Sequence, residues 1–435
     1  MVSEVVAASD PNRVLEAIVR IESPKLIARL LRIVRDVGRA EELAQDALVG
    51  ALESWRKDGA PDNPGAWLMT AAKNKALNEV SRRKRIVKKH EEVERELELK
   101  QMKHPADALD FALDDEVGDD LLRLVFTSCH PLLSGEARVA LTLRVVGGLS
   151  TQEIARAFVV PEATIAQRIV RAKKTLAESD VTYELPHGEA LAERLASVLE
   201  VVYLVFNEGY SSTSGEDILR PPLVDEALRL GRILRGLMPD ESEVHGLFAL
   251  MALHASRSPS RVDASGKPVL LADQDRLRWD RSLIHQGRDA LALARKLARG
   301  KGASLEGARL GTYAIQAAIS ECHAVAPTAS ETSWIKIASL YGELYALTGS
   351  PIVELNRAVA VAMAEGPLAG LELLDLLSGE PSLADYHLLF AARGDLLAKL
   401  SRNEEARDAF TRAASLTKNG QERALLLARA EALKS

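Results

Sequence analysis

The sequence predicts an all-helical (all-α) chain made of several domains. Ala, Leu, Arg and Glu, which favour helices, are abundant, whereas aromatic residues make up only 4% of the chain. Apolar residues recur at helical spacing through most of its length, and no sustained alternating segment indicates a strand. Because 435 residues are too many for a single hydrophobic core, about two to four domains are expected.

The composition also narrows the classes of function. The net charge is only −6, so any nucleic-acid-binding surface must be local. Cys129 and Cys322 lie far apart and match no zinc-binding spacing, and we expect reduced, buried thiols. No nucleotide-binding glycine loop, metal-ligand cluster or nucleophile elbow is visible, so we expect neither an enzyme nor a cofactor. The absence of a signal-peptide pattern and of a membrane-spanning apolar run predicts a soluble, cytoplasmic protein.

Residues 149–174 have the pattern of a helix-turn-helix. Ser150 is a suitable N-cap, and Glu153 three residues later completes a capping box at the start of the first helix. Pro161 cannot continue that helix but suits the first turn of the next one, which places the turn at 158–161. The segment therefore predicts two short helices joined by a tight turn.

The second of these helices presents a basic face suited to the DNA major groove. Ile165, Ile169 and Ala172 repeat at helical spacing and are expected to face inward. The outward residues, which can reach base edges, phosphates or a thymine methyl group, are Thr164, Gln167, Arg168, Arg171 and Lys174. DNA binding is the favoured interpretation, and an ordinary helical hairpin with a solvated basic face is the alternative.

Two further helices are predicted in residues 12–57, separated by Gly38. The second, AEELAQDALVGALESW, combines an apolar stripe with an acidic outer face. The residues of that face are Glu41, Glu42, Gln45, Asp46 and Glu53. Such a face is either solvated or a docking surface for a basic helix of a partner protein.

A third helix, GAWLMTAAKNKALNEVSRRKR, follows a loop at residues 57–64. Its inner side is expected to contain Trp67, Leu68, Ala71, Ala72, Leu77 and Val80. Its outer side carries Lys73, Asn74, Lys75, Asn78, Arg82 and Arg83. Residues 61–90 hold 8 Lys or Arg against 2 Asp or Glu, so the helix suits contacts with phosphates and bases, and a solvated face is the alternative.

The charge then changes sign. Residues 91–120 hold 12 Asp or Glu against 3 Lys or Arg, which is typical of a solvated linker. An acidic linker between two basic modules could also mask them when no DNA is bound. The Cys129–His130 pair that follows is better explained by a helix end at Pro131 than by a metal site, because no further ligand lies nearby.

Residues after 180 are predicted to form further helices. An apolar helix is expected at 190–210, capped by Gly209, and others at 220–237 and 243–255. Trp279 and Ile284 are expected to point inward in the helix that DQDRLRWDRSLIHQG opens. The charged residues nearby predict a structural network, with a functional site as the alternative; they are Asp273, Asp275, Asp280 and Arg281.

From about residue 311 the pattern becomes one of stacked helix pairs. Helices are predicted at 313–323, 333–347, 352–364, 368–377, 384–399, 403–416 and 420–433. The segment HLLFAARGDLLAKLSRNEEARDAFTRAASLT is similar to a tetratricopeptide repeat, with small residues at Ala391, Gly394 and Ala406 where helices approach. Such arrays bind peptides or proteins on a concave face, and a packed helical domain without a groove is the alternative.

The order and spacing of three segments resemble an extracytoplasmic-function (ECF) sigma factor of bacterial RNA polymerase. The segments are AEELAQDALVGALESW, WLMTAAKNKALNEVSRR and residues 136–176. The resemblance implies that the acidic helix binds core RNA polymerase. It also implies that the helix at 67–83 reads and opens the minus-ten promoter element, while the preceding loop holds a flipped base. The helix-turn-helix would read the minus-thirty-five element.

Residue 78 and four motifs in the C-terminal half can also be compared with that family. Most members have Asp where this chain has Asn78, which bears on the minus-ten sequence that is read and not on the role of the helix. The motifs YLVFNEGY, RWDRSLI, YAIQAAI and SPIVELNRAVAVA are similar to those of the subgroup with a long, repeat-type C-terminal extension. The resemblance thereby covers nearly the whole chain, and the family has no catalytic residue.

These patterns predict five segments and one function. The segments are a sigma domain 2-like module at 1–90, an acidic linker at 91–118, a sigma domain 4-like module at 119–180, a helical extension at 186–300 and a tetratricopeptide-like domain at 301–435. The expected function is promoter-specific transcription initiation with core RNA polymerase and promoter DNA as partners. The extension is expected to regulate activity and to bind a protein or peptide, with no membrane contact. The alternative is a helix-turn-helix regulator that binds DNA without joining polymerase and senses a signal through its C-terminal half.

Overall fold

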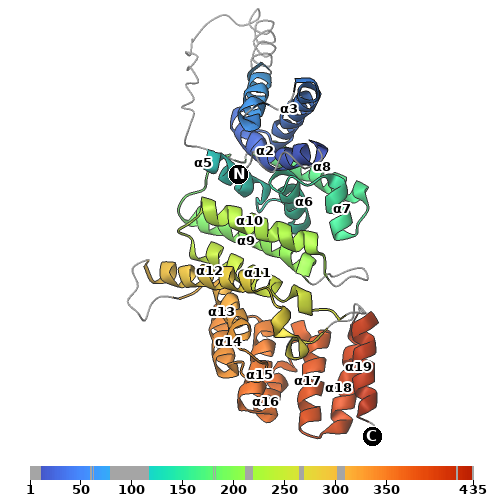
Figure 1. Cartoon of the computed structure of the whole chain (residues 1–435). Coiled ribbons are helices and arrows are strands. Elements are labelled where there is room, and N and C mark those ends of the chain that lie inside the picture. Colours follow the sequence, from blue (N-terminus) through green and yellow to red (C-terminus); the bar gives the residue numbers. More distant parts are fainter. Residues whose placement is uncertain are drawn as a thin grey trace, which may run out of the picture. The chain divides into compact units, whose positions relative to one another are not determined.

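The structure, a computed structural model, is built from α-helices (Figure 1). It describes residues 11–58, 63–78, 117–179, 183–210, 219–263, 269–300, 309–417 and 420–433, together with residues 61 and 181. No β-strand occurs among these residues, and the predicted all-helical class is confirmed. The chain divides into two compact units, the first made of residues 1–216 and 220–237 and the second of residues 217–219 and 238–435.

The first unit begins with two helices, α2 (Pro11–Val34) and α3 (Val37–Asp58), that pack against each other. The prediction that Gly38 separates them was wrong, because Gly38 lies inside α3. The chain turns instead at Arg35, whose φ is 52°. Asp36 then starts α3 by accepting a hydrogen bond of 2.8 Å from the Arg39 amide. The N-capping aspartate, and not a glycine, therefore determines where the second helix begins.

A third helix covers residues 64–78 within the described part of the chain. Asn63 caps it by accepting a hydrogen bond of 3.0 Å from the Ala66 amide. The ring of Trp67 lies edge-on to that of Trp55 in α3, with 5.6 Å between the centroids. The Lys75 ammonium donates to the backbone carbonyl of Asp46 at 2.9 Å. These contacts attach the third helix to α3.

Residues 91–116 of the acidic run lie outside the described residues. Four helices come next in the chain. They are α5 (Val117–Ser128), α6 (Gly135–Val145), α7 (Thr151–Phe158) and α8 (Glu162–Glu178). α5 packs on α2, while α8 packs on α6 and α7. The helix-turn-helix segment therefore belongs to a bundle that also contacts the N-terminal helices.

Two longer helices, α9 (Glu189–Tyr210) and α10 (Pro221–Leu237), complete the first unit and lie side by side (Figure 1). The predicted helix at 190–210 is confirmed, but Gly209 is not its cap, because it lies inside the last turn. A Cβ atom on Gly209 would come within 2.7 Å of the Val224 amide nitrogen, so glycine permits the close approach of α10. The first unit thus includes the start of the segment predicted as a domain at 186–300.

The second unit starts with α11 (Ser242–Ala255), α12 (Arg281–Gly300) and α13 (Thr312–Val325), which pack on one another. Three 3₁₀ turns lie between α11 and α12, at Ser258–Ser260, Leu271–Asp273 and Arg276–Arg278. Trp279 and Ile284 are buried, as predicted, although Trp279 precedes the helix.

Charged residues before α12 hold the local backbone. The Asp275 carboxylate accepts a hydrogen bond of 2.9 Å from the Leu277 amide, and Asp280 accepts one of 3.0 Å from the Leu283 amide. These bonds cap the last 3₁₀ turn and the start of α12. They support the structural interpretation of this charged segment.

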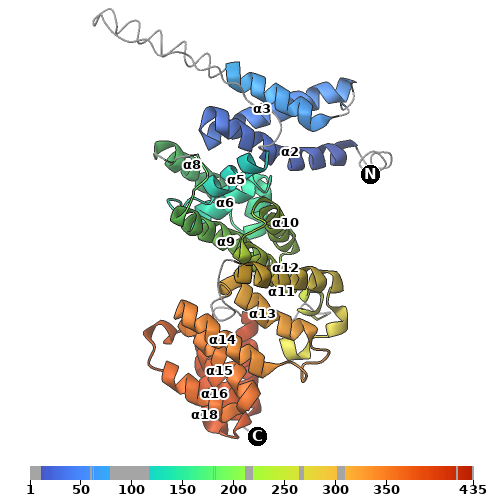
Figure 2. The same cartoon turned by 90° about the vertical axis from the view of Figure 1, so that its left-hand side faces the viewer.

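The remaining helices of the second unit pack each against the next in the chain. They are α14 (Trp334–Thr348), α15 (Pro351–Glu365), α16 (Pro367–Leu377), α17 (His387–Lys399), α18 (Asn403–Leu416) and α19 (Gly420–Ala432). Figure 2 shows α14, α15 and α16 lying side by side. A Cβ on Gly394 would lie 2.8 Å from the buried Phe410 ring, which explains the small residue there. The helices match the predicted pattern, while their tetratricopeptide character stays a prediction.

Candidate nucleic-acid and polymerase interfaces

The helix-turn-helix forms as predicted. Ser150 Oγ accepts a hydrogen bond of 3.1 Å from the Glu153 amide, and the Glu153 carboxylate accepts one of 2.7 Å from the Ser150 amide. This reciprocal pair completes the capping box of α7. Val159 makes the turn in the left-handed region, with φ of 52°, and α8 begins directly after Pro161. Local sequence signals are therefore sufficient to explain both helix ends.

The second helix of the motif, α8, has a buried and an open face. Its buried residues are Ile165, Ile169, Ala172 and Leu176. Among the residues predicted to contact DNA, Gln167, Arg171 and Lys174 are exposed, and Thr164 is half-buried near the helix start. These side chains are spaced along one helix face with their polar groups accessible, as reading of base edges in a major groove requires.

Arg168 is less accessible than its neighbours on α8. Its guanidinium pairs with the Glu136 carboxylate of α6 at 2.6 Å, and 28% of its side chain is exposed. Together with Phe158 and Leu204, it lines an apolar pocket of about 300 Å³ whose walls come from α6, α7, α8 and α9. A contact between Arg168 and DNA would therefore either use the N–H groups that do not face Glu136 or replace this ion pair.

The acidic face predicted for α3 is only partly open. Glu42, Gln45, Asp46 and Glu53 are exposed, as expected. Glu41 does not lie on that outer face, because its side chain is 5% exposed. The periodicity of α3 alone did not reveal that a second module covers this position.

Glu41 is held by two cations from the helix-turn-helix bundle. Its carboxylate accepts a hydrogen bond of 2.6 Å from Arg144 Nε on α6 and forms an ion pair with the Lys173 ammonium on α8. Sequence reasoning did not single out Lys173. Its position, four residues after the buried Ile169, was the available signal that it lies at the edge of the inner face.

A second ionic contact joins the same two parts of the first unit. The Asp120 carboxylate of α5 lies 3.7 Å from the Arg32 guanidinium of α2 and 2.8 Å from that of Arg123. Burial raises the pKa of Asp120, and the surrounding arginines oppose that effect. The N-terminal helices and the helix-turn-helix bundle thus meet through two buried carboxylates, Glu41 and Asp120.

The basic helix at 64–78 presents polar residues to solvent. Asn74 and Asn78 are exposed and Lys73 is half-buried. Leu68 and Ala72 are buried as predicted, but Trp67 and Leu77, predicted on the inner side, are each 36% exposed because they lie at its edge. The predicted DNA-contacting residues Arg82 and Arg83 lie outside the described residues.

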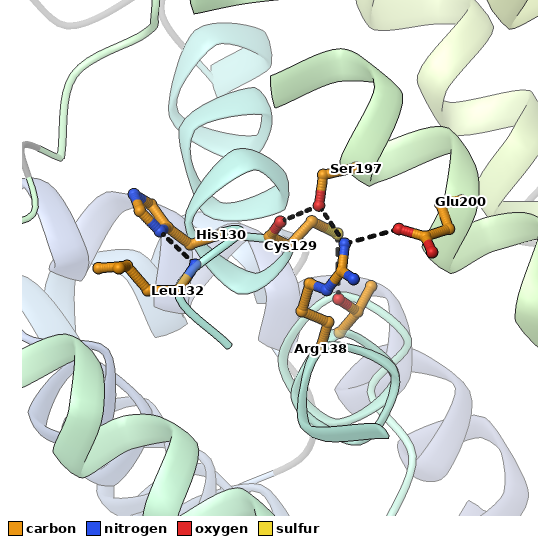
Figure 3. A network of polar contacts seen from close by, with 7 residues as sticks. Cys129, His130, Leu132, Arg138, Ser197 and Glu200 are labelled. Atoms are coloured by element: carbon orange, nitrogen blue, oxygen red, sulfur yellow. Dashed lines mark hydrogen bonds and ion pairs between the residues drawn. The ribbon is translucent and has the colours of Figure 1, made fainter. Parts of the chain in front are cut away.

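The Cys129–His130 pair is part of a helix end, as the sequence predicted. α5 ends at Ser128, and burial raises the pKa of the Cys129 thiol to about 11. His130 Nδ1 accepts a hydrogen bond of 3.2 Å from the Leu132 amide (Figure 3). Burial, together with the nearby Arg194, lowers the pKa of His130 to about 4. Within the described ranges, no three His, Cys, Asp or Glu side chains gather as a metal site.

Comparison with known proteins gives three family matches along the chain. Residues 18–86 match sigma-70 region 2, residues 123–176 match sigma-70 region 4, and residues 194–295 match a family of unknown function, DUF6596. The uncharacterized protein R00370 of Rhizobium meliloti is 43% identical over 404 residues, covering 93% of this chain and 92% of that protein. The RNA polymerase sigma-H factor of Pseudomonas aeruginosa is 27% identical over 168 residues, covering 38% of this chain and 85% of that protein. No solved structure matches the chain.

The chain therefore belongs to the same family as R00370, and it carries a sigma-70 region 2 module, a sigma-70 region 4 module and a long C-terminal extension after region 4. In these terms α2, α3 and the helix at 64–78 form the region 2 module, and α5 to α8 form the region 4 module. No described helix is long and apolar enough to cross a lipid bilayer.

Proposed function

We propose that the chain is an ECF-type sigma factor that binds core RNA polymerase and directs promoter-specific initiation in the cytoplasm. The observation that supports this best is the exposed polar face of α8, where Gln167, Arg171 and Lys174 lie on a complete helix-turn-helix. Region 2 precedes this motif along the chain, in the order found in sigma factors. The relative named as an RNA polymerase sigma-H factor supports the same assignment.

In this proposal α8 reads the minus-thirty-five element and the basic helix of region 2 reads the minus-ten element. Arginine and glutamine side chains can make bidentate contacts with guanine and adenine edges in the major groove. The asparagines Asn74 and Asn78 are exposed on the helix at 64–78 and have suitable donors and acceptors. Lys73, Arg82 and Arg83 add positive charge for phosphate contacts.

Core RNA polymerase is proposed to bind the exposed residues on the acidic face of α3, namely Glu42, Gln45, Asp46 and Glu53. Glu41 can join that interface only when Arg144 and Lys173 move away, because they cover its carboxylate and leave the side chain 5% exposed. Polymerase binding through the whole face would therefore separate the region 2 and region 4 modules.

The C-terminal extension is proposed to regulate this activity through a protein or peptide partner. Its helices from α13 onward pack in succession along the chain, as in helical repeat proteins that bind partners. The unit boundary after Leu237 offers a place for truncation that leaves the first unit intact.

Run-off transcription with purified core enzyme and genomic promoter fragments tests the proposal. We expect the full chain to support defined transcripts, and we expect loss of these transcripts with Arg171→Ala. The matched control is Arg402→Gln, which changes an exposed arginine of the second unit. A chain that binds duplex DNA but neither retains core polymerase nor supports transcription would be a DNA-binding regulator instead. Unchanged output after deletion of residues 238–435 would refute the regulatory role of the second unit.

A further inference from the structure

The first two helices of the extension are bonded to the backbone of the region 4 module. The Arg194 guanidinium of α9 donates to the Phe126 carbonyl at 2.7 Å. Ser197 Oγ donates to the Cys129 carbonyl at 2.6 Å and in turn accepts a hydrogen bond from Arg138 of α6 (Figure 3). Arg138 also pairs with Glu200 at 2.9 Å. α9 thereby reaches the C-terminal end of α5 and is fastened to α6.

Arg220, directly before α10, completes the C-terminal end of α7. In a continued helix the Ala157 carbonyl would accept a hydrogen bond from the amide of residue 161, but that residue is a proline and has no N–H. Arg220 Nη1 supplies the missing donor at 2.9 Å. A cation at this end of α7 is also favoured by the helix dipole. Pro161, which separates α7 from α8, thus leaves the Ala157 carbonyl without a helical donor, and Arg220 donates to this carbonyl instead.

The position of Arg220 is determined by its own neighbours. Its side chain, only 9% exposed, forms an ion pair with Glu208 in the last turn of α9. Its amide donates to the Gly209 carbonyl at 2.7 Å. The motif around Glu208 and Gly209 therefore has a structural task, which is to hold this arginine against α7.

Arg229 of α10 holds the connection that precedes α7. Its Nη2 atom donates to the carbonyls of Val146 and Gly147, at 3.1 and 3.2 Å. The Glu226 carboxylate, 2% exposed, receives two hydrogen bonds from the same guanidinium, at 3.0 and 2.7 Å. A Cβ on Gly147 would lie 2.9 Å from the Glu226 carboxylate, so glycine is needed for this approach. Arg229 thus holds the α6 end of the connection to α7, while Arg220 holds the C-terminal end of α7.

We propose that Arg220 and Arg229 are positioning residues for the helix-turn-helix, so that the DNA-reading module of this protein extends to Leu237. α9 and α10 are a structural part of region 4, and the remainder of the extension begins after them. This inference rests on the proposed reading of promoter DNA by α8. The boundary between the two compact units, which also falls at Leu237, agrees with it.

The experiment compares the full chain with its Arg220→Gln variant by hydrogen–deuterium exchange. Loss of a charge-assisted hydrogen bond at the end of α7 should raise amide exchange in α7 and the following turn by about tenfold or more. Arg220→Lys keeps the charge and should restore part of the protection. Amides of α18 and of α2 should exchange at the same rate in every variant. Arg402→Gln, far along the chain in the second unit, is the matched control.

The functional arm uses a library of duplex DNA with a randomised core. We expect the full chain to enrich one sequence motif, and Arg220→Gln to enrich it about tenfold less while keeping its affinity for unselected DNA. Unchanged exchange in α7 and unchanged enrichment would overturn the inference. Equal acceleration of exchange throughout the first unit would also overturn it, because that is general destabilisation.

Failure of the parent chain to read DNA and failure of Arg220→Gln to fold would give different results. If the parent chain itself enriches no sequence, the proposed promoter reading fails, while the exchange measurement still decides the role of Arg220. If Arg220→Gln does not fold, the milder Arg220→Lys and Arg229→Lys variants are measured in the same way. The inference would be overturned if the α7 amides of both lysine variants exchanged at the same rate as those of the unsubstituted chain.

Discussion

Replacement of Glu41 by alanine should loosen the contact between the region 2 and region 4 modules. Removal of one member of a fully buried ion pair costs about 3–5 kcal/mol, because the remaining charge is left without a partner. Glu41 is 5% exposed, but Arg144 and Lys173 each keep 24% of their side chains accessible to water. Water can therefore solvate the two cations in part, and we expect a cost of about 2 kcal/mol for Glu41→Ala.

A double-mutant cycle isolates the ion pair from other effects of the substitution. We expect Glu41→Ala and Lys173→Ala to show a coupling energy of about 1–2 kcal/mol, which lies within the range for directly contacting charged residues. The measurement is the opening free energy of α3 and α8 amides from native-state hydrogen exchange of the full chain. Glu42→Ala is the matched control, because Glu42 is exposed on the same helix and pairs with Arg39, which is also on α3.

The cycle has a clear negative result. A coupling energy below about 0.5 kcal/mol, the usual limit of additivity for independent sites, would show that Glu41 and Lys173 do not interact in solution. The link between the modules through Lys173 would then be refuted, and the contact of Glu41 with Arg144 would have to be tested by the same cycle. A loss of protection with Glu42→Ala as large as that with Glu41→Ala would equally refute the reasoning, because solvent exposure could then not explain the difference.

Three further expectations concern DNA, polymerase and pH. Arg171→Ala should weaken binding to a minus-thirty-five duplex by about 1–3 kcal/mol in a titration, whereas an equal loss on scrambled DNA would identify a phosphate contact. Asp46→Lys should lower affinity for core polymerase in a pull-down without changing DNA binding, since only the Asp46 backbone is used by Lys75; unchanged retention would remove Asp46 from the interface. Burial, aided by Arg257 and Arg276, lowers the pKa of His323 from 6.5 to about 4. Between pH 6.5 and 4, His323 is therefore protonated in the unfolded chain but neutral in the folded one. Because protonation favours the unfolded chain, the second unit should lose up to about 3 kcal/mol of stability as the pH falls from 6.5 to 4. Urea unfolding at stepped pH should show a smaller loss for His323→Gln, and identical profiles for the two proteins would contradict this assignment.

The helix-turn-helix could be predicted in detail because its signals are local. A capping box joins Ser150 and Glu153, three residues apart, and Pro161 ends one helix and precedes the next. These effects act within one helical turn and do not depend on the rest of the fold. The same reason explains why the helix pairs after residue 311 were found with bounds close to those of the structure.

Gly38 and Gly209 show where local reasoning about glycine was insufficient. Both were interpreted as helix ends, since glycine is common there. In the structure Gly38 lies inside α3, and Gly209 makes room for the α10 backbone. Whether a glycine ends a helix or permits a close approach depends on what packs against it, and that neighbour lies elsewhere in the chain.

By itself, the sequence determined the all-helical class, the order of the two modules and the amphipathic faces of their helices, because helical periodicity and capping depend on residues within a few positions of one another. Only the tertiary structure decided that Glu41 is covered by Arg144, which is 103 residues away, and that Arg220 completes α7 across 63 residues. Contacts at such separations depend on how helices pack in three dimensions, and no spacing along one helix encodes them.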